Sequence, residues 1–202
     1  MDVEVDMEVT VVRGGISPPR FTQANSGQHG LTLIELLIGV AIAVILFGLA
    51  VPSLGGLVAS NRVSAHVNGL LGALALARSE AVKANTHVVV CKSADGNRCA
   101  KTGDWDQGWI VFVDDDHDRQ RQDGERLVRE HASLPKGYRL RYAAFGSKNY
   151  LFYDSRGFTN TNGTFSLCPP AETSPPRAVI LSKSGRARVS RSRPDGSPIK
   201  CP

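Results

Sequence analysis

Apolar side chains follow one another almost without interruption in one early segment of the chain. No Lys, Arg, Asp or Glu occurs from Leu36 to Asn61. As a helix, the segment Leu31–Val51 would measure about 31 Å, which is enough to cross the hydrocarbon core of a bilayer. We therefore predict a transmembrane helix over residues 31–57.

A second helical pattern continues directly from the first. Pro52, Gly55 and Gly56 stand between them and predict a kink or a locally melted turn rather than a helix end. Beyond residue 58 the apolar residues recur every three to four positions, as in one face of a helix: Val63, Val67, Leu70, Leu74, Ala77 and Ala81. We predict an amphipathic helix over residues 58–86 that ends near Ala84, with Asn85 as its C-terminal stop.

After residue 86 the pattern changes to short strands separated by Gly, Asn, Asp and Pro. The predicted strands are His87–Cys91, Trp109–Val113, Leu127–Glu130, Tyr138–Tyr142, Tyr150–Tyr153, Thr164–Cys168, Ala178–Ser182 and Arg186–Arg191. Many short strands at this spacing indicate antiparallel sheets. The predicted fold class is α+β, with the long N-terminal helix packed on a β-rich domain over residues 87–202.

Charge is distributed unevenly over the 202 residues, whose formal net charge is +5. Between Arg177 and Lys200 there are seven basic residues and a single acidic one. A basic segment of this kind favours an anionic partner, either nucleic acid or a membrane surface. The alternative is a solvated strand edge that charge keeps soluble.

One carboxylate stands at the head of the first apolar run. The segment Gly30-Leu31-Thr32-Leu33-Ile34-Glu35 resembles the class III signal of type IV pilins and pseudopilins. The resemblance implies that a prepilin peptidase removes a leader, residues 1–30, by cutting between Gly30 and Leu31, and that Leu31 is N-methylated. It also implies that Glu35 pairs with the free amine of Leu31 in a neighbouring subunit, because a charge in apolar surroundings requires a partner.

The β-rich domain carries a second resemblance. The segment Cys91–Cys99, then Trp105 and Gly108–Asp114, is similar to the GspH/FimT family of minor pseudopilins, as are Ser184–Arg188 and Cys201. The resemblance implies a structural subunit at or near the tip of a type IV pilus or a type II secretion pseudopilus, with other pilins as partners. It also implies a single pass through the inner membrane and a periplasmic C-terminal domain. We expect no cofactor.

The four cysteines show no zinc-type or C-x-x-C spacing. An even number of cysteines in an exported chain is typical of disulfides in an oxidising compartment. Proximity favours Cys91–Cys99 and Cys168–Cys201, although four cysteines allow three pairings.

The basic segment contains a short motif, Gly185-Arg186-Ala187-Arg188. It matches the GRxR motif that, in FimT-like proteins, is associated with DNA binding in natural transformation. Strand alternation would put Arg186 and Arg188 on one face, where each guanidinium could contact a phosphate. Further basic residues extend the patch: Lys183, Arg191 and Arg193. The alternatives are a basic edge strand, a subunit interface, or a GspH-like subunit that acts only in type II secretion without DNA.

Four acidic residues have the spacing of a calcium-binding EF-hand loop: Asp114, Asp116, Asp118 and Glu125. Arg119 occupies the position of the usual glycine, and the flanking segments are predicted strands rather than helices. We therefore favour a solvated acidic hairpin tip over a calcium site. Because no common catalytic motif is present, we predict that the protein is not an enzyme; a membrane-anchored enzyme using the acidic loop is the remaining alternative.

Overall fold

The computed structural model describes residue 30 and residues 32–170 and 174–201. These residues form two units, divided between Ala43 and Val44, and each is described by itself. The helix α1 (Leu33–Ala84) crosses the division, and all strands belong to the second unit. This arrangement of one long helix and antiparallel sheets confirms the predicted α+β class.

The first unit contains the start of α1, which Thr32 caps. The Glu35 N–H donates to Thr32 Oγ1 at 3.3 Å, and the Leu36 N–H donates to the Thr32 carbonyl at 3.2 Å. A Thr followed three residues later by Glu is the sequence pattern of a capping box. The Glu35 backbone N–H therefore takes part in the helix start, in a cap that the sequence analysis did not predict.

The apolar side chains of the first helical turns are exposed. Leu33 and Ile34, for example, are 77% and 62% exposed. By the criteria of length and mean hydropathy, no helix within the described part of the chain qualifies as a membrane span.

Helix α1 continues through Pro52, Gly55 and Gly56 without interruption. The predicted melted turn is therefore wrong. A proline removes only one hydrogen bond of the helical ladder, and residues that favour helix on both sides maintain the helix. The helix ends as predicted: Asn85 has a left-handed φ of 51°, and the Thr86 N–H donates back to the Ala81 carbonyl at 3.3 Å, which is the hydrogen bond of a Schellman cap.

Two antiparallel sheets follow the helix. The first has the order β3-β2-β1-β5, with β1 (His87–Lys92), β2 (Trp109–Asp114), β3 (Leu127–His131) and β5 (Tyr150–Tyr153). The second has the order β4-β6-β7-β8, with β4 (Arg139–Ala144), β6 (Gly163–Cys168), β7 (Arg177–Leu181) and β8 (Ala187–Ser190). A short 3₁₀ helix, η1 (Trp105–Gln107), precedes β2. All eight predicted strands are present, with ends shifted by at most two residues.

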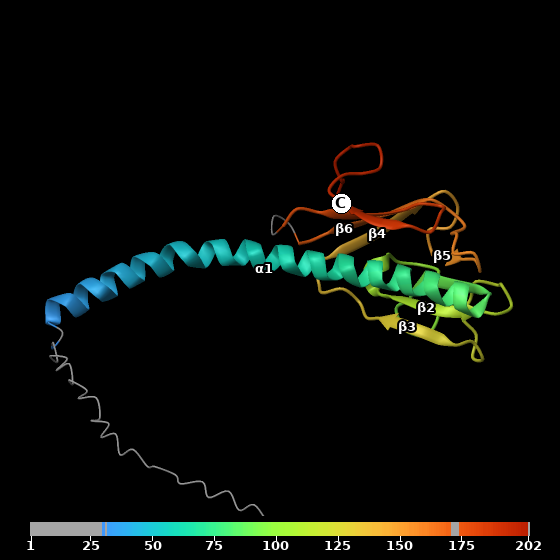
Figure 1. Ribbon diagram of the computed structural model, residues 1–202, viewed down its shortest axis with the longest axis horizontal. Coiled ribbons are helices and arrows are strands. Elements are labelled where there is room, and N and C mark those ends of the chain that lie inside the picture. The colour runs from blue at the N-terminus through green and yellow to red at the C-terminus, as the bar shows by residue number, and fades with distance from the viewer. Residues whose placement is uncertain (1–29, 31, 171–173, 202) are drawn as a thin grey trace, which may run out of the picture. The chain divides into compact units, whose positions relative to one another are not determined.

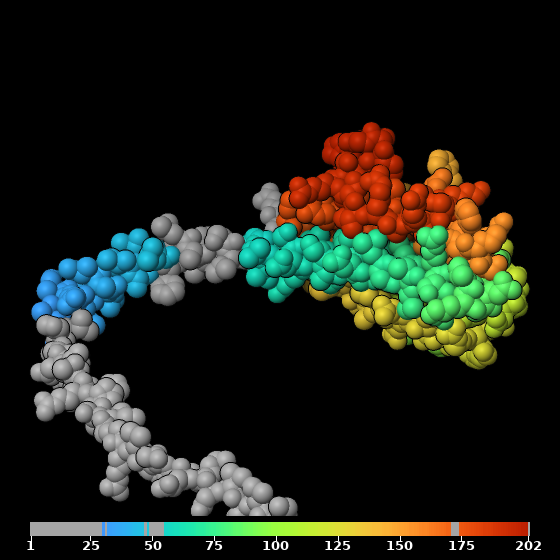
Figure 2. Space-filling view, in the orientation of Figure 1, coloured from blue at the N-terminus to red at the C-terminus, as the bar shows by residue number. Residues whose placement is uncertain are grey.

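One face of α1 packs between the two sheets and forms the main core with them. The buried helix residues are those of the predicted apolar face, together with Ala73. Both sheets contribute large side chains to the same core, including Trp109 from the first sheet and Phe165 from the second. Figures 1 and 2 show the helix, in green, between the yellow strands of the first sheet and the red strands of the second.

A smaller core covers the opposite face of the first sheet. It consists of Val89, Cys91, Ile110 and Phe112, with Phe152 and other partly buried residues packed against it. The disulfide Cys91–Cys99 joins β1 to the loop that follows it. The first sheet is therefore buried on both faces, which explains why β1 and β2 are almost wholly apolar in sequence.

An ion pair connects α1 to the segment that leads into β3. Arg126 Nη2 donates to Glu80 Oε2 at 2.9 Å, and Lys83 Nζ lies 3.4 Å from Glu80 Oε1. The hydrogen bond from Arg126 is the main cause that holds the pKa of Glu80 below its ordinary value of 4.5. The stabilisation by the Arg126–Glu80 pair is therefore fully present above the ordinary pKa of 4.5. It is lost as the pH falls through the lowered pKa of Glu80 in the folded protein.

We expect Glu80→Gln to lower the melting temperature at about pH 7 and to have a progressively smaller effect as the pH falls below the ordinary pKa of 4.5, because Glu80 then loses the charge that Arg126 pairs with. Arg126→Gln should have a similar effect at neutral pH, and the double variant should lose no more than the larger single loss, because both remove the same interaction. Thermal unfolding followed by circular dichroism measures this. A pH-independent effect of Glu80→Gln would contradict the assignment.

Candidate functional site

The predicted basic residues lie along the edge of the second sheet. Among the described strands, β8 pairs only with β7, and Arg188 pairs in register with Ile180. Arg186 immediately precedes β8 rather than lying within it, because the strand is shorter than predicted. Four of the basic side chains are exposed and form no ion pair with another described residue: Lys183, Arg186, Arg188 and Arg191.

Gly185, the first residue of the motif, has a structural explanation. It is buried in the turn between β7 and β8, with a left-handed φ of 80°. A Cβ at this position would overlap the carbonyl oxygen of Gly157. The glycine is therefore needed for the turn itself, and only the arginines of the motif are free to contact a ligand.

The tail after β8 folds back on itself and is fixed by the second disulfide. The Arg193 N–H donates to the Ser197 carbonyl at 2.9 Å, which closes a turn, and Cys201 is bonded to Cys168 at the end of β6. Both disulfides are those that proximity favoured. The Arg193 side chain is partly buried and close enough to Asp195 to lower the pKa of that carboxyl, after the larger effect of hydrogen bonds from Ser197.

An apolar groove of about 520 Å³ lies beside the basic residues. Its lining includes Thr164, Ile180, Pro194 and Phe145. Phe145 is 89% exposed, the highest value among the large hydrophobic side chains described. Phe145 was not predictable as part of this surface, because it is far from the arginines along the chain and only the pairing of β4, β6 and β7 brings it to this groove.

The predicted processing residues are only partly described. Gly30 is exposed, and Leu31 lies outside the described residues. Glu35 is exposed on the first turn of α1, where the capping bond to Thr32 involves its backbone N–H.

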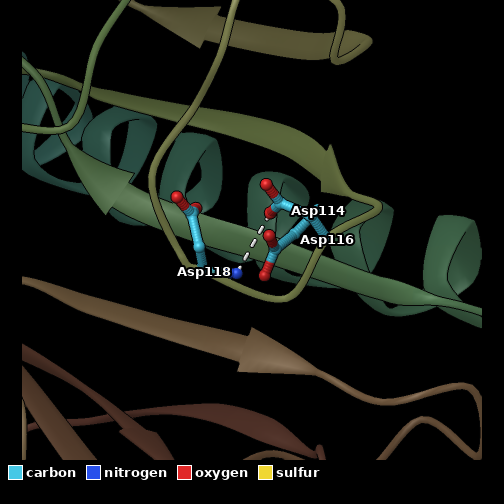
Figure 3. Close-up of side chains that lie close together, drawn as sticks. All are labelled: Asp114, Asp116 and Asp118. Atoms are coloured by element: carbon cyan, nitrogen blue, oxygen red, sulfur yellow. Dashed lines mark hydrogen bonds between the residues drawn. The ribbon is translucent and has the colours of Figure 1, made fainter.

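The acidic loop between β2 and β3 brings three of its four candidate residues together. One carboxylate oxygen from each of Asp114, Asp116 and Asp118, the aspartate cluster, lies within 4.8 Å of the other two (Figure 3). Asp116 and Asp118 are exposed, as expected of a solvated tip, but Asp114 is fully buried. Burial raises the pKa of Asp114, and the neighbouring charges of Asp116 and Asp118 act in the same direction.

Glu125 does not join this cluster. Its Oε1 accepts from the Asp115 N–H at 3.1 Å and its Oε2 accepts from the Gln122 N–H at 2.9 Å. Both bonds close the loop, and Glu125 offers no carboxylate oxygen within 4.8 Å of oxygens from all three aspartates. The EF-hand spacing, which would make Glu125 a ligand, therefore brings together only three of its four residues.

The chain is similar to known families in two regions. The family model for the type II transport protein GspH matches residues 66–185, which is more than half of the chain. The model for the prokaryotic N-terminal methylation motif matches residues 25–51. The first match ends at Gly185, so it includes every described strand except β8. The second match includes Gly30, Leu31 and Glu35.

Individual relatives were found by sequence and by structure. The pilin-like protein PilA1 of Thermus thermophilus is 30% identical over 168 residues, which cover 80% of this chain and 98% of that protein. The type IV minor pilin FimU of Pseudomonas aeruginosa is similar with a TM-score of 0.49 and 20% identity, over 64% of this chain and 89% of FimU. The minor pseudopilin EpsH of the Vibrio cholerae type 2 secretion system has a TM-score of 0.46 and 17% identity, over 64% and 96% of the two chains.

We expect Gly185→Ala to destabilise the protein more than Gly196→Ala. Both glycines have a left-handed φ, but a Cβ at Gly196 would meet no other atom within 4 Å. Gly196→Ala should lower the free energy of unfolding by only about 1–2 kcal/mol, the strain of a left-handed φ on alanine. Gly185→Ala should lower it by the same strain and by roughly 1–3 kcal/mol more, because its Cβ would overlap Gly157. Chemical denaturation of both variants measures the difference, and equal losses would refute the overlap.

Proposed function

The chain belongs to the GspH family, and from this membership we propose that it is a minor pilin or pseudopilin at or near the tip of a type IV pilus or a type II secretion pseudopilus. The observation that carries the proposal is the GspH match over residues 66–185. The role is structural: the subunit is built into a filament together with other pilins or pseudopilins.

In this function the N-terminal segment first anchors the subunit and later joins the filament. A prepilin peptidase cuts between Gly30 and Leu31, Leu31 is methylated, and residues 31–57 hold the protein in the inner membrane with its β-rich domain in the periplasm. The methylation-motif match over residues 25–51 supports the processing. The exposed apolar side chains from Leu33 to Leu46 support the anchoring, because they call for a lipid or protein environment that the described residues do not supply.

Glu35 has two roles in this proposal, and they involve different atoms. Its backbone N–H is engaged with Thr32 at the helix start, and its carboxylate is free to pair with the amine of Leu31 in a neighbouring subunit. Such a pair, surrounded by apolar helices, would favour one register over others, because a displaced carboxylate would remain buried without a partner.

We expect Glu35→Gln to leave processing and membrane retention unchanged while reducing incorporation into filaments by about tenfold or more, because one partner of a buried charge pair is lost. Glutamine is compatible with a capping box, so the helix start is preserved. Quantitative immunoblotting of sheared filaments measures incorporation, and mass spectrometry of the membrane fraction measures cleavage and methylation.

Thr32→Ala is the matched control, since it removes the cap and keeps the charge. If it impairs incorporation as strongly as Glu35→Gln does, the capping of the helix rather than the charge pair is responsible.

As the finer form of this function, we propose that the exposed arginines bind the DNA backbone during natural transformation. Arg186 and Arg188 support this, because they are exposed and not engaged in ion pairs with other described residues. Phe145 and Ile180 line the same groove, and Ile180 is the register partner of Arg188. The exposed ring of Phe145 therefore offers a surface near the arginines on which a base of single-stranded DNA could stack.

We expect the double variant Arg186→Ala/Arg188→Ala to weaken DNA binding by the full-length protein in detergent, and to reduce the slope of log K against log salt by up to about 1.8 for duplex DNA. Fluorescence anisotropy at several salt concentrations measures both. Arg139→Ala/Arg141→Ala is the matched control: it makes the same change of charge in the same sheet, but Arg139 and Arg141 already pair with Asp104 at 3.3 and 3.5 Å.

If both double variants lose the same DNA affinity, the net charge of the domain, rather than the position of Arg186 and Arg188, explains the binding. Binding that is absent in the wild type, or unchanged by Arg186→Ala/Arg188→Ala, would leave the alternative of a subunit that acts in type II secretion without DNA.

A further inference from the structure

Asp114 is buried without adequate partners for its charge. Its side chain has no exposed surface, and its Oδ2 has no hydrogen-bond partner among the described residues. Its Oδ1 accepts only from the Arg119 N–H, at a long 3.4 Å. A buried carboxylate in this state carries a large free-energy cost unless a positive charge compensates it. No described basic side chain forms an ion pair with it.

The other two members of the aspartate cluster converge on one point. Gln122 Nε2 donates to Asp116 Oδ2 at 2.7 Å and to Asp118 Oδ2 at 3.0 Å. This amide therefore presents a partial positive charge to both carboxylates at once. A half-turn of the amide would present Gln122 Oε1 instead, which is an additional oxygen of the kind that hard cations bind.

The loop that holds these groups is already curled. His117 and Arg119 have left-handed φ values of 65° and 64°, and the two bonds accepted by Glu125 close the loop across its base. The guanidinium of Arg119 lies 5.7 Å from the centre of the Phe152 ring. This contact gives a reason for arginine at a position where an EF-hand has glycine, since packing against the small core compensates for the backbone strain.

We propose that the aspartate cluster binds a calcium ion, with carboxylate oxygens of Asp114, Asp116 and Asp118 as ligands and the Gln122 amide oxygen as a further one. Oxygen ligands alone select a hard cation over a transition metal. Three carboxylates on an irregular loop suit calcium, whose coordination geometry is adaptable, better than magnesium, which demands near-ideal octahedral geometry. Glu125 holds the loop and does not contact the ion, which distinguishes this site from an EF-hand.

The test is calcium binding by the full-length protein in detergent after treatment with EDTA. We expect isothermal titration with CaCl₂ to show one site, and 1 mM calcium to raise the melting temperature by about 1–5 °C for a dissociation constant of 10⁻³–10⁻⁴ M. Magnesium at the same concentration should give a clearly smaller shift. Because the test does not depend on filament assembly or on DNA, its result is independent of the proposed function.

Three variants connect the binding to the cluster. Asp116→Asn changes an exposed side chain and should abolish the calcium-dependent shift while leaving the fold intact. Asp114→Asn should abolish the shift as well, and should raise the melting temperature in EDTA because the uncompensated charge is removed. Asp115→Asn makes the same change of charge in the same loop, outside the cluster, and should keep the full response.

The proposal is overturned if the wild type shows no calcium-dependent shift up to about 10 mM, which is above the 10⁻⁴–10⁻³ M range of extracellular calcium modules. It is equally overturned if Asp116→Asn responds like the wild type, if Asp115→Asn loses the response, or if magnesium stabilises as strongly as calcium.

Discussion

The buried face of helix α1, from Val63 to Ala81, holds the β-rich domain together. The two sheets are not hydrogen-bonded to each other, and each has an inner face of large apolar side chains that would meet water without the helix. Alanines at positions 73, 77 and 81 are fully buried and belong to the same core as the large side chains of both sheets. The same helix continues toward the N-terminus into the apolar segment that we propose enters the filament. In a GspH family member, one helix would therefore both hold the β-rich domain together and connect it to the filament.

Much of this architecture could be predicted from local patterns. The strands β1 and β2 were recognisable because both of their faces are buried and they are almost wholly apolar, and Asn85 was recognisable as a helix stop because it tolerates a left-handed φ. The division of the strands into two sheets was not predictable, since pairing depends on contacts between residues far apart in sequence. For the same reason the burial of Asp114 and the place of Phe145 beside the arginines appeared only in the structure. The loop-closing role of Glu125 is local, but the sequence does not show which backbone N–H groups its carboxylate accepts from.

Short motifs in this chain combine structural and functional residues, and the structure separates them. In the segment Gly185–Arg188 the glycine is required by the turn, whereas the arginines are exposed. In the acidic loop Glu125 stabilises the backbone, whereas the aspartates converge on a common point. At the N-terminus the Glu35 backbone N–H donates to the Thr32 cap, whereas the Glu35 carboxylate forms no ion pair with another described residue. A motif match alone would have assigned one role to every member, and so would have misplaced Gly185 and Glu125.

The disulfide Cys168–Cys201 determines how the domain would respond to mechanical force. Strand β8 lies at the edge of its sheet, and a pull on the tail beyond it would peel β8 from β7 one hydrogen bond at a time. The disulfide transfers the load to β6, which is paired with β4 on one side and β7 on the other. Separating β6 requires many hydrogen bonds to shear together, which takes a much larger force than peeling. Arg191 and Arg193 lie between β8 and Cys201, so a force applied to them would reach the sheet by two routes, directly through β8 and through the disulfide to β6.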